Sequence, residues 1–142
     1  MSLQYLLDTN VLSIAYRSDA PLSLVELLLL HQHRCAITAP VWHELSYGVA
    51  RMAPSRRRDF LGRYIQQTVR PNYPILPYDE AAATWHAQER ARRHQTGHPT
   101  PFVDTMIAAI AVTNDLTLVT NNTKDFEAFE ALKLEDWTRS LD

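Results

Sequence analysis

The sequence predicts a single α/β domain over residues 1–142, built as a three-layer α/β/α sandwich around a short, mostly parallel sheet. Its 142 residues are 46% hydrophobic and 21% charged, a balance that supports one buried core and leaves no room for a second domain. Short apolar runs alternate along the chain with longer segments of helical pattern. Strands that are separated by helices pair in parallel and need helices on both faces of the sheet.

Four short runs that are rich in apolar or β-branched residues are typical of buried strands. The first, residues 3–7, ends at an acid, and the last, residues 116–120, is followed by polar residues. The other two are residues 35–38 and 75–76. We expect these four segments to form the sheet.

Apolar residues recur at helical spacing in six longer segments between and after these strands, so we expect six helices. They span residues 9–16, 22–33, 40–52, 55–68, 79–95 and 101–113.

Proline and glycine mark two connections between these elements. Three prolines within residues 71–77 indicate a stiff connection, and residues 96–101 have the composition of a loop. We expect the helix that follows this loop to begin with Thr100 as its cap and Pro101 in its first turn.

Composition excludes several classes of protein. The net charge of −2 excludes binding of nucleic acid by bulk positive charge, and three glycines provide no phosphate-binding glycine-rich loop. The lone Cys35 cannot form an internal disulfide, which favours a reducing compartment. The most apolar stretch, residues 22–30, is too short to cross a membrane, and residues 1–8 lack the pattern of a signal peptide. We therefore expect a cytoplasmic protein with no membrane partner.

Three carboxylates stand where apolar neighbours predict burial. Asp8 directly follows the first strand, at the edge where open α/β sheets bind ligands, although an aspartate there can also cap the next helix. Glu44 falls within an apolar helical stripe that includes Val41 and Gly48. The alternative for Glu44 is a place at the edge of that stripe, paired with an arginine. Asp104 lies in the first turn of an otherwise apolar helix, so we expect a positive group beside it.

A fourth group of polar residues follows the last strand and includes Thr120, Asn122 and Asp125. The alternative here is a turn that only caps the next helix. Carboxylates gathered at one edge of a parallel sheet would favour Mg²⁺ or Mn²⁺. The chemistry that fits such a site is attack of metal-activated water on a phosphodiester.

At these positions the sequence resembles the PIN-domain ribonucleases, and among them the VapC toxins of type II (VapBC) toxin–antitoxin systems. The likeness covers nearly the whole chain, and it is strongest for the VapC subgroup that cleaves initiator tRNA in the anticodon loop. The segments that carry it are residues 6–10, Glu44, residues 78–84, residues 102–108, residues 119–126 and residues 134–137.

The resemblance implies a role for each candidate residue. Asp8, Glu44 and Asp104 match the family's metal-binding acids. Many PIN domains carry an aspartate where this chain has Asn122, whereas the initiator-tRNA subgroup carries its acid at the position of Asp125. The resemblance therefore implies that Asp125 is a fourth catalytic acid and that Asn10, Thr120 and Asn122 are supporting polar residues.

The resemblance also implies the partners: an RNA substrate, with tRNA the expected one, and a VapB-type antitoxin whose C-terminal segment occupies the active groove. A homodimer, or a hetero-oligomer with the antitoxin, is the expected assembly. Arginines of two helices, in residues 56–70 and 90–93, are candidate RNA contacts, with solvated helix faces as the alternative. Two other functions remain open: another Mg²⁺-dependent phosphoryl hydrolase, and a non-catalytic binding module of the same fold.

Overall fold

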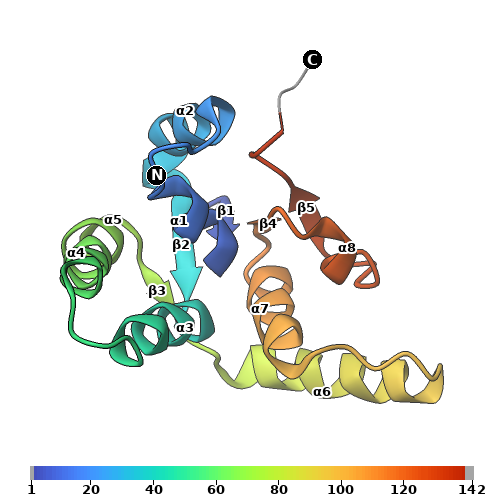
Figure 1. Ribbon diagram of the computed structural model, residues 1–142. Helices are drawn as coiled ribbons and strands as arrows, with labels where there is room; N and C mark the ends of the chain where they lie inside the picture. The colour runs from blue at the N-terminus through green and yellow to red at the C-terminus, as the bar shows by residue number, and fades with distance from the viewer. Residues whose placement is uncertain (1, 140–142) are drawn as a thin grey trace.

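The computed structural model describes residues 2–139, which fold around a parallel sheet with the strand order β3-β2-β1-β4-β5 (Figure 1). Every pair of neighbouring strands in this sheet is parallel, so the predicted α/β architecture is confirmed. The strands are β1 (Tyr5–Leu7), β2 (Cys35–Thr38), β3 (Ile75–Leu76), β4 (Thr117–Val119) and β5 (Lys133–Glu135).

The edge strand β5 is not among the four strands predicted from the apolar pattern. It is three residues long, and both Lys133 and Glu135 are exposed. A strand this short, with one half-buried residue, carries too few apolar positions for a pattern of period two to be recognised.

The helices follow the predicted segments closely, with shifts of one or two residues at most ends. They are α1 (Thr9–Ala15), α2 (Leu22–His31), α3 (Ala39–Ala50), α4 (Arg56–Tyr64), α5 (Arg70–Asn72), α6 (Glu80–Gln95), α7 (Phe102–Thr113) and α8 (Thr123–Phe126). A 3₁₀ turn (Gln32–Arg34) ends α2, and a π-helical turn (Ile65–Val69) joins α4 to α5. The fourth predicted helix therefore runs on past residue 68, and Pro71 lies in α5 and not in a connection.

The start of α7 differs from the prediction. Pro101 and not Thr100 occupies the capping position, and it makes no side-chain capping bond. The hydroxyl of Thr105 donates to the Pro101 carbonyl (2.8 Å) and lies 2.7 Å from the hydroxyl of Thr100. Thr100 therefore ties the loop to the first turn of α7 through Thr105 instead of capping the helix.

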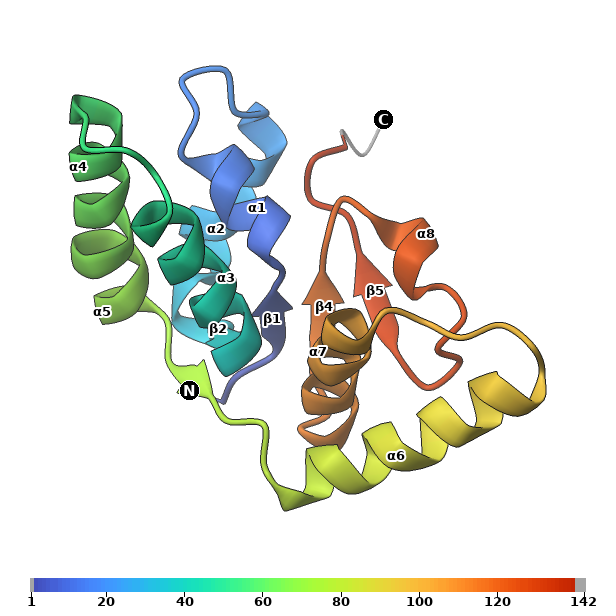
Figure 2. The same cartoon turned by 60° about the horizontal axis from the view of Figure 1, so that its bottom comes forward.

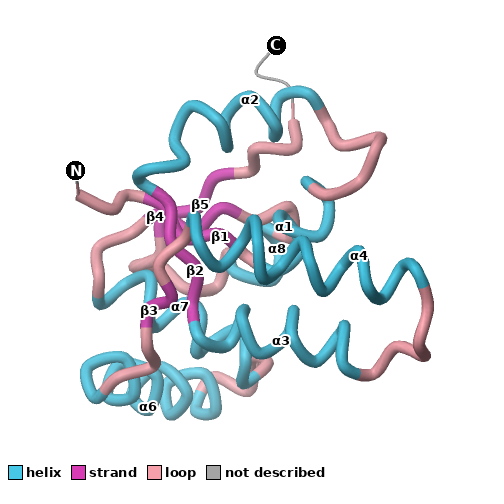
Figure 3. Tube along the Cα trace, turned by 90° about the vertical axis from the view of Figure 1, so that its left-hand side faces the viewer, coloured by secondary structure: helices cyan, strands magenta, loops and turns pink. Residues whose placement is uncertain are grey.

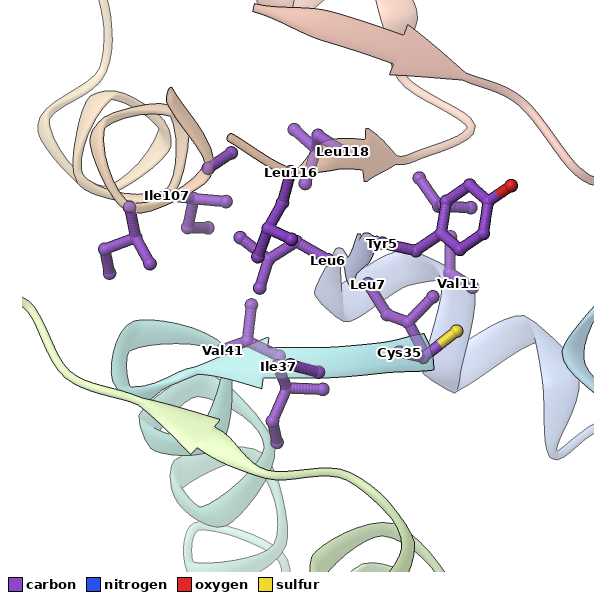
Figure 4. Close-up of a cluster of buried hydrophobic side chains, with 14 of the residues drawn as sticks. Tyr5, Leu6, Leu7, Val11, Cys35, Ile37, Val41, Ile107, Leu116 and Leu118 are labelled. Carbon is purple, nitrogen blue, oxygen red and sulfur yellow. The ribbon is translucent and has the colours of Figure 1, made fainter. Parts of the chain in front are cut away.

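Helices cover both faces of the sheet, as the prediction requires. Helix α2 lies on one side of the strands, and α3 and α7 lie on the other, with α6 packed outside α7 (Figures 1 and 3). The core between these layers is formed by strand residues such as Leu6, Ile37 and Leu118 together with Val41 of α3 and Ile107 of α7 (Figure 4). In residues 2–139 no helix is both long and apolar enough to cross a membrane.

The strand order places a topological switch point between β1 and β4. From β1 the chain builds β2 and β3 on one side, and it then returns to build β4 and β5 on the other. The connections that leave β1 and β4 therefore diverge, which opens a crevice at the carboxyl ends of these two strands.

Candidate acidic site at the switch point

Asp8 and Thr120 meet at this switch point. Asp8 follows β1 and is 7% exposed, while Thr120 follows β4 and is fully buried. The Thr120 hydroxyl donates to Asp8 Oδ2 (2.9 Å), and the Asp8 backbone N–H donates to the Val119 carbonyl (3.0 Å). The second carboxylate oxygen, Oδ1, accepts the backbone N–H of Thr9 (2.8 Å) and so caps α1. Asp8 is therefore a helix cap and also lies at the carboxyl edge of the sheet, as predicted.

Burial raises the pKa of Asp8, and the charge of Asp125 adds to this rise. The hydrogen bonds from Thr120 and Thr9 act in the opposite direction because they stabilise the ionised form. Thr120 is itself held in place, because its oxygen accepts the backbone N–H of Asn122 (3.0 Å). The carboxylate of Asp8 is therefore fixed in orientation and poorly solvated.

Asp104 lies half-buried in the first turn of α7 and faces the same crevice. Its pKa is raised by partial burial first and then by the negative charges of Asp8 and Asp125. Asp125 is exposed in the first turn of α8, where its backbone N–H donates to the Asn122 carbonyl (3.1 Å). The loop after β4 thus brings a third carboxylate toward the first two.

The predicted burial of Glu44 is wrong, since its side chain is exposed on α3. Its carboxylate nevertheless belongs to the cluster, because partial desolvation and then the charges of Asp8 and Asp104 raise its pKa. The hydroxyl of Thr9 is buried and makes no regular hydrogen bond within residues 2–139, but it lies near enough to Glu44 to offset part of this rise. His43 offsets a further part.

No basic side chain among the described residues pairs with any of these four acids. The ion pairs of residues 2–139 lie elsewhere and join Arg92 to Glu89, Lys133 to Asp115 and Arg139 to Asp136. The arginine partner considered for Glu44 and the positive group expected beside Asp104 are therefore both ruled out for this part of the chain. The cluster carries negative charge that the fold itself does not neutralise.

The donor set fits a hard divalent cation that keeps much of its water. Within residues 2–139, no three acidic, histidine or cysteine side chains stand close enough to hold a metal ion by themselves. Mg²⁺ is commonly held by only one or two carboxylates, with water filling its other positions. Asp8 and Asp104 supply such carboxylates, and Glu44, Thr9 and Thr120 add further oxygen atoms around them, so the residues present suit this ion.

The three residues predicted as polar support occupy different positions around the cluster. Thr120 bonds Asp8 directly. Asn10 is half-buried on α1, and Asn122 is exposed at the capping position of α8, where its side chain makes no capping bond. Thr9 is not among the predicted site residues. Its position directly after Asp8 at the end of a strand is the sequence feature that indicates it.

A cavity of about 460 Å³ adjoins the acids on the side of Glu44, between α1, α3 and α4. Thr9 and Glu44 form its boundary with the acidic cluster. Apolar side chains such as Leu45, Val49, Leu61 and Ile65 and the arginines Arg17, Arg51 and Arg57 line the rest. The cavity therefore combines an apolar surface with positive charge beside the negative cluster.

The fold and the site together define an α/β/α domain with an oxygen-rich acidic site at the carboxyl edge of a parallel sheet, toward which the arrowheads of β1, β4 and β5 point in Figure 2. The chain belongs to the PIN-domain family, whose model matches residues 5–132. The resemblance to PIN domains predicted from the sequence is thereby confirmed.

The chain is similar to VapC toxins over nearly its whole length. A relative from Shigella flexneri named tRNA(fMet)-specific endonuclease VapC is 34% identical over 137 residues, which cover 96% of this chain and 99% of the relative. The structure of FitAcB from Neisseria gonorrhoeae matches with a TM-score of 0.85 and 30% identity, over 94% of this chain and 98% of that one. VapBC2 from Rickettsia felis, bound to a DNA fragment from its promoter, matches with a TM-score of 0.82 and 28% identity, over 96% and 99% of the two chains.

Proposed function

We propose that this protein is a metal-dependent endoribonuclease toxin of the VapC type, which hydrolyses phosphodiester bonds in RNA and is neutralised by a VapB-type antitoxin. The observation that carries the proposal is the group of four acids around the switch point, none of which has a basic partner within residues 2–139. Family membership and the names of the relatives support the same activity. The cytoplasm, where tRNA is found, is the proposed site of action.

In this mechanism Asp8 and Asp104, together with Glu44 at the exposed rim, would hold Mg²⁺ or Mn²⁺. A metal held there would supply an activated water and would stabilise charge on the phosphate. Thr120 keeps the Asp8 carboxylate in one orientation. Asp125, in the first turn of α8, shapes the pocket and adds to its negative field.

The proposed substrate is a single-stranded loop of tRNA. The name of the Shigella relative specifies tRNA(fMet), and this supports initiator tRNA as the first candidate. For the antitoxin, the 460 Å³ cavity beside Glu44 offers an apolar surface and arginines to an extended segment with apolar and acidic side chains. The solved VapBC2 complex from Rickettsia felis supports a partner of this kind. A homodimer stays a prediction.

The test of this function is incubation of the purified protein with initiator tRNA, an elongator tRNA and a panel of small phosphate esters, with Mg²⁺ or with EDTA. We expect Mg²⁺-dependent cleavage of initiator tRNA at one loop position, mapped by sequencing the RNA ends. Turnover of the small esters instead of RNA would favour another phosphoryl hydrolase. Metal-independent RNA binding without cleavage would favour a non-catalytic module.

Thr120→Val should lower kcat for RNA cleavage by about 10- to 100-fold, because it removes the hydroxyl that orients Asp8. The replacement has nearly the same shape, so the fold should persist. Thr117→Val is the matched control: Thr117 lies on β4, is also buried, and among the described residues makes no hydrogen bond to the four acids. Equal activity of the two variants in steady-state kinetics would contradict the role of Thr120.

A further inference from the structure

A second polar site lies where α6 and α7 pack together, on residues that the proposed mechanism does not use. His86 of α6 is 2% exposed. Its Nδ1 lies 2.7 Å from the hydroxyl of Tyr78, but its Nε2 has no hydrogen-bond partner among the described residues. A buried ring nitrogen without a partner is costly to a fold, so it points to a ligand atom that completes it.

His86 borders a small cavity of about 110 Å³, which is also lined by Tyr78, Arg90, Phe102 and two alanines. Phe102 is 51% exposed, and its ring meets His86 edge-on with a centroid distance of 4.5 Å. The Arg90 guanidinium lies 5.2 Å from the centroid of the same ring and has no carboxylate partner within residues 2–139. The cavity therefore opens beside an exposed aromatic ring and an unpaired cation.

The chemistry of these groups selects a ligand that accepts hydrogen bonds and has a flat face. Burial and then the charge of Arg90 lower the pKa of His86, which favours the neutral ring. If the phenol of Tyr78 donates to Nδ1, the ring proton is on Nε2, and the two residues His86 and Arg90 that line the cavity then both carry donors. An unpaired nucleotide provides the acceptors on its base edge or phosphate, and its base has the face that stacks on aromatic rings and arginine.

The position of the cavity relative to the acids suits one strand of RNA that reaches both. Phe102 precedes Asp104 by two residues in the first turn of α7. Residues two apart on a helix point to nearly opposite sides, so the cavity and the acids are separated by roughly one helix diameter, about 10–12 Å. Figure 2 shows α6 and α7 joined at this end by the loop that leads into α7.

We propose that Phe102, Arg90 and His86 form a subsite for one unpaired nucleotide of the RNA substrate, whose base stacks on Phe102 and whose acceptor atoms meet His86 Nε2 and Arg90. This inference rests on the proposed ribonuclease function. It adds a determinant of which loop nucleotide is held about one helix diameter from the acids.

The test measures KM and kcat of Phe102→Ala, Phe102→Trp and Arg90→Gln on a short single-stranded RNA that contains the cleavage site. Loss of base stacking should raise KM for Phe102→Ala by about 10-fold, with kcat little changed because the acids are untouched. Phe102→Trp should keep KM near that of the wild type, since it keeps an aromatic face. Leu29→Ala, which trims an exposed apolar residue of α2, is the matched control and should leave KM unchanged.

A series of RNAs with one abasic nucleotide each identifies the bound base. One abasic position should raise KM for the wild type and have no further effect on Phe102→Ala. An equal KM for wild type, Phe102→Ala and Arg90→Gln would overturn the subsite. A change of oligomeric state in Phe102→Ala, seen by sedimentation, would also overturn it and would assign the ring to contact with a second copy of the chain.

Fluorescence anisotropy with the same RNA in EDTA separates this proposal from the proposed function. If the wild-type protein cleaves no RNA and Phe102→Ala nevertheless binds the RNA more weakly than the wild type, the nuclease activity is overturned and the subsite is kept. Cleavage with unchanged affinity in every variant would keep the nuclease activity and overturn the subsite. Arg90→Gln alters an exposed side chain, so it tests the site even if Phe102→Ala folds poorly.

Discussion

Asp8→Asn is expected to lower RNA cleavage by at least about 100-fold while the protein stays folded. The substitution removes one of the carboxylates proposed to hold the metal, and a bound metal would supply several kcal/mol of transition-state stabilisation. The amide oxygen of asparagine can still accept the Thr9 N–H that Asp8 accepts now, so the cap of α1 is preserved. Initial rates on the RNA loop substrate, together with circular dichroism, measure the two effects.

Asp115→Asn is the matched control for this variant. Asp115 has a positive φ of 54°, a conformation that asparagine tolerates, and its ion pair with Lys133 is exposed. The control should cleave RNA at the wild-type rate. Cleavage by Asp8→Asn at a rate within a few-fold of the wild-type rate would contradict the proposed mechanism.

Binding of Mg²⁺ is expected to raise the melting temperature of the wild-type protein and to have no effect on Asp104→Asn. A ligand that binds only the folded state at ten times its Kd stabilises by about 1.4 kcal/mol, which corresponds to a rise of roughly 3–6 °C for a domain of this size. In EDTA the melting temperature of Asp104→Asn should equal or exceed that of the wild type. The reason is that the substitution removes a negative charge that Asp8 and Asp125 repel.

Differential scanning fluorimetry over a range of Mg²⁺ concentrations measures these shifts, and Ca²⁺ and Na⁺ at equal ionic strength control for screening. Asp79→Asn is a further control, since Asp79 caps α6 and the amide keeps an acceptor for the Ala82 N–H. A Mg²⁺ response of Asp104→Asn as large as that of the wild type would contradict metal binding by Asp104.

Much of the architecture could be predicted from the sequence because local patterns report it directly. The run that ends at Asp8 is a strand, and residues 35–38 and 75–76 form strands with the predicted bounds. β5 could not be found in this way, because its pairing with β4 and not its own composition makes it a strand. The start of α7 was placed wrongly for a related reason: Thr100 bonds the side chain of Thr105 instead of a backbone N–H.

The burial predicted for Glu44 is wrong for a different reason. The helical pattern correctly placed Val41 on the buried face of α3, and Glu44, three residues later, shares that side. The sequence could not reveal that α1, α3 and α4 leave a cavity of about 460 Å³ beside this part of α3. An open cavity exposes the same helix face that is buried one turn earlier, so periodicity alone overestimated the burial of Glu44.

The sequence by itself determined which carboxylates are unusual and that they follow strands or begin helices, because solvation cost and helix capping depend on neighbours along the chain. Only the tertiary structure decided that Asp8, Glu44, Asp104 and Asp125 share one electrostatic environment without a basic partner among residues 2–139, and that His86 borders a separate cavity. The physical reason is that charge repulsion and the pairing of buried polar atoms act through space. These interactions join residues more than a hundred positions apart, such as Asp8 and Thr120, whose distance is set by the order of strands in the sheet.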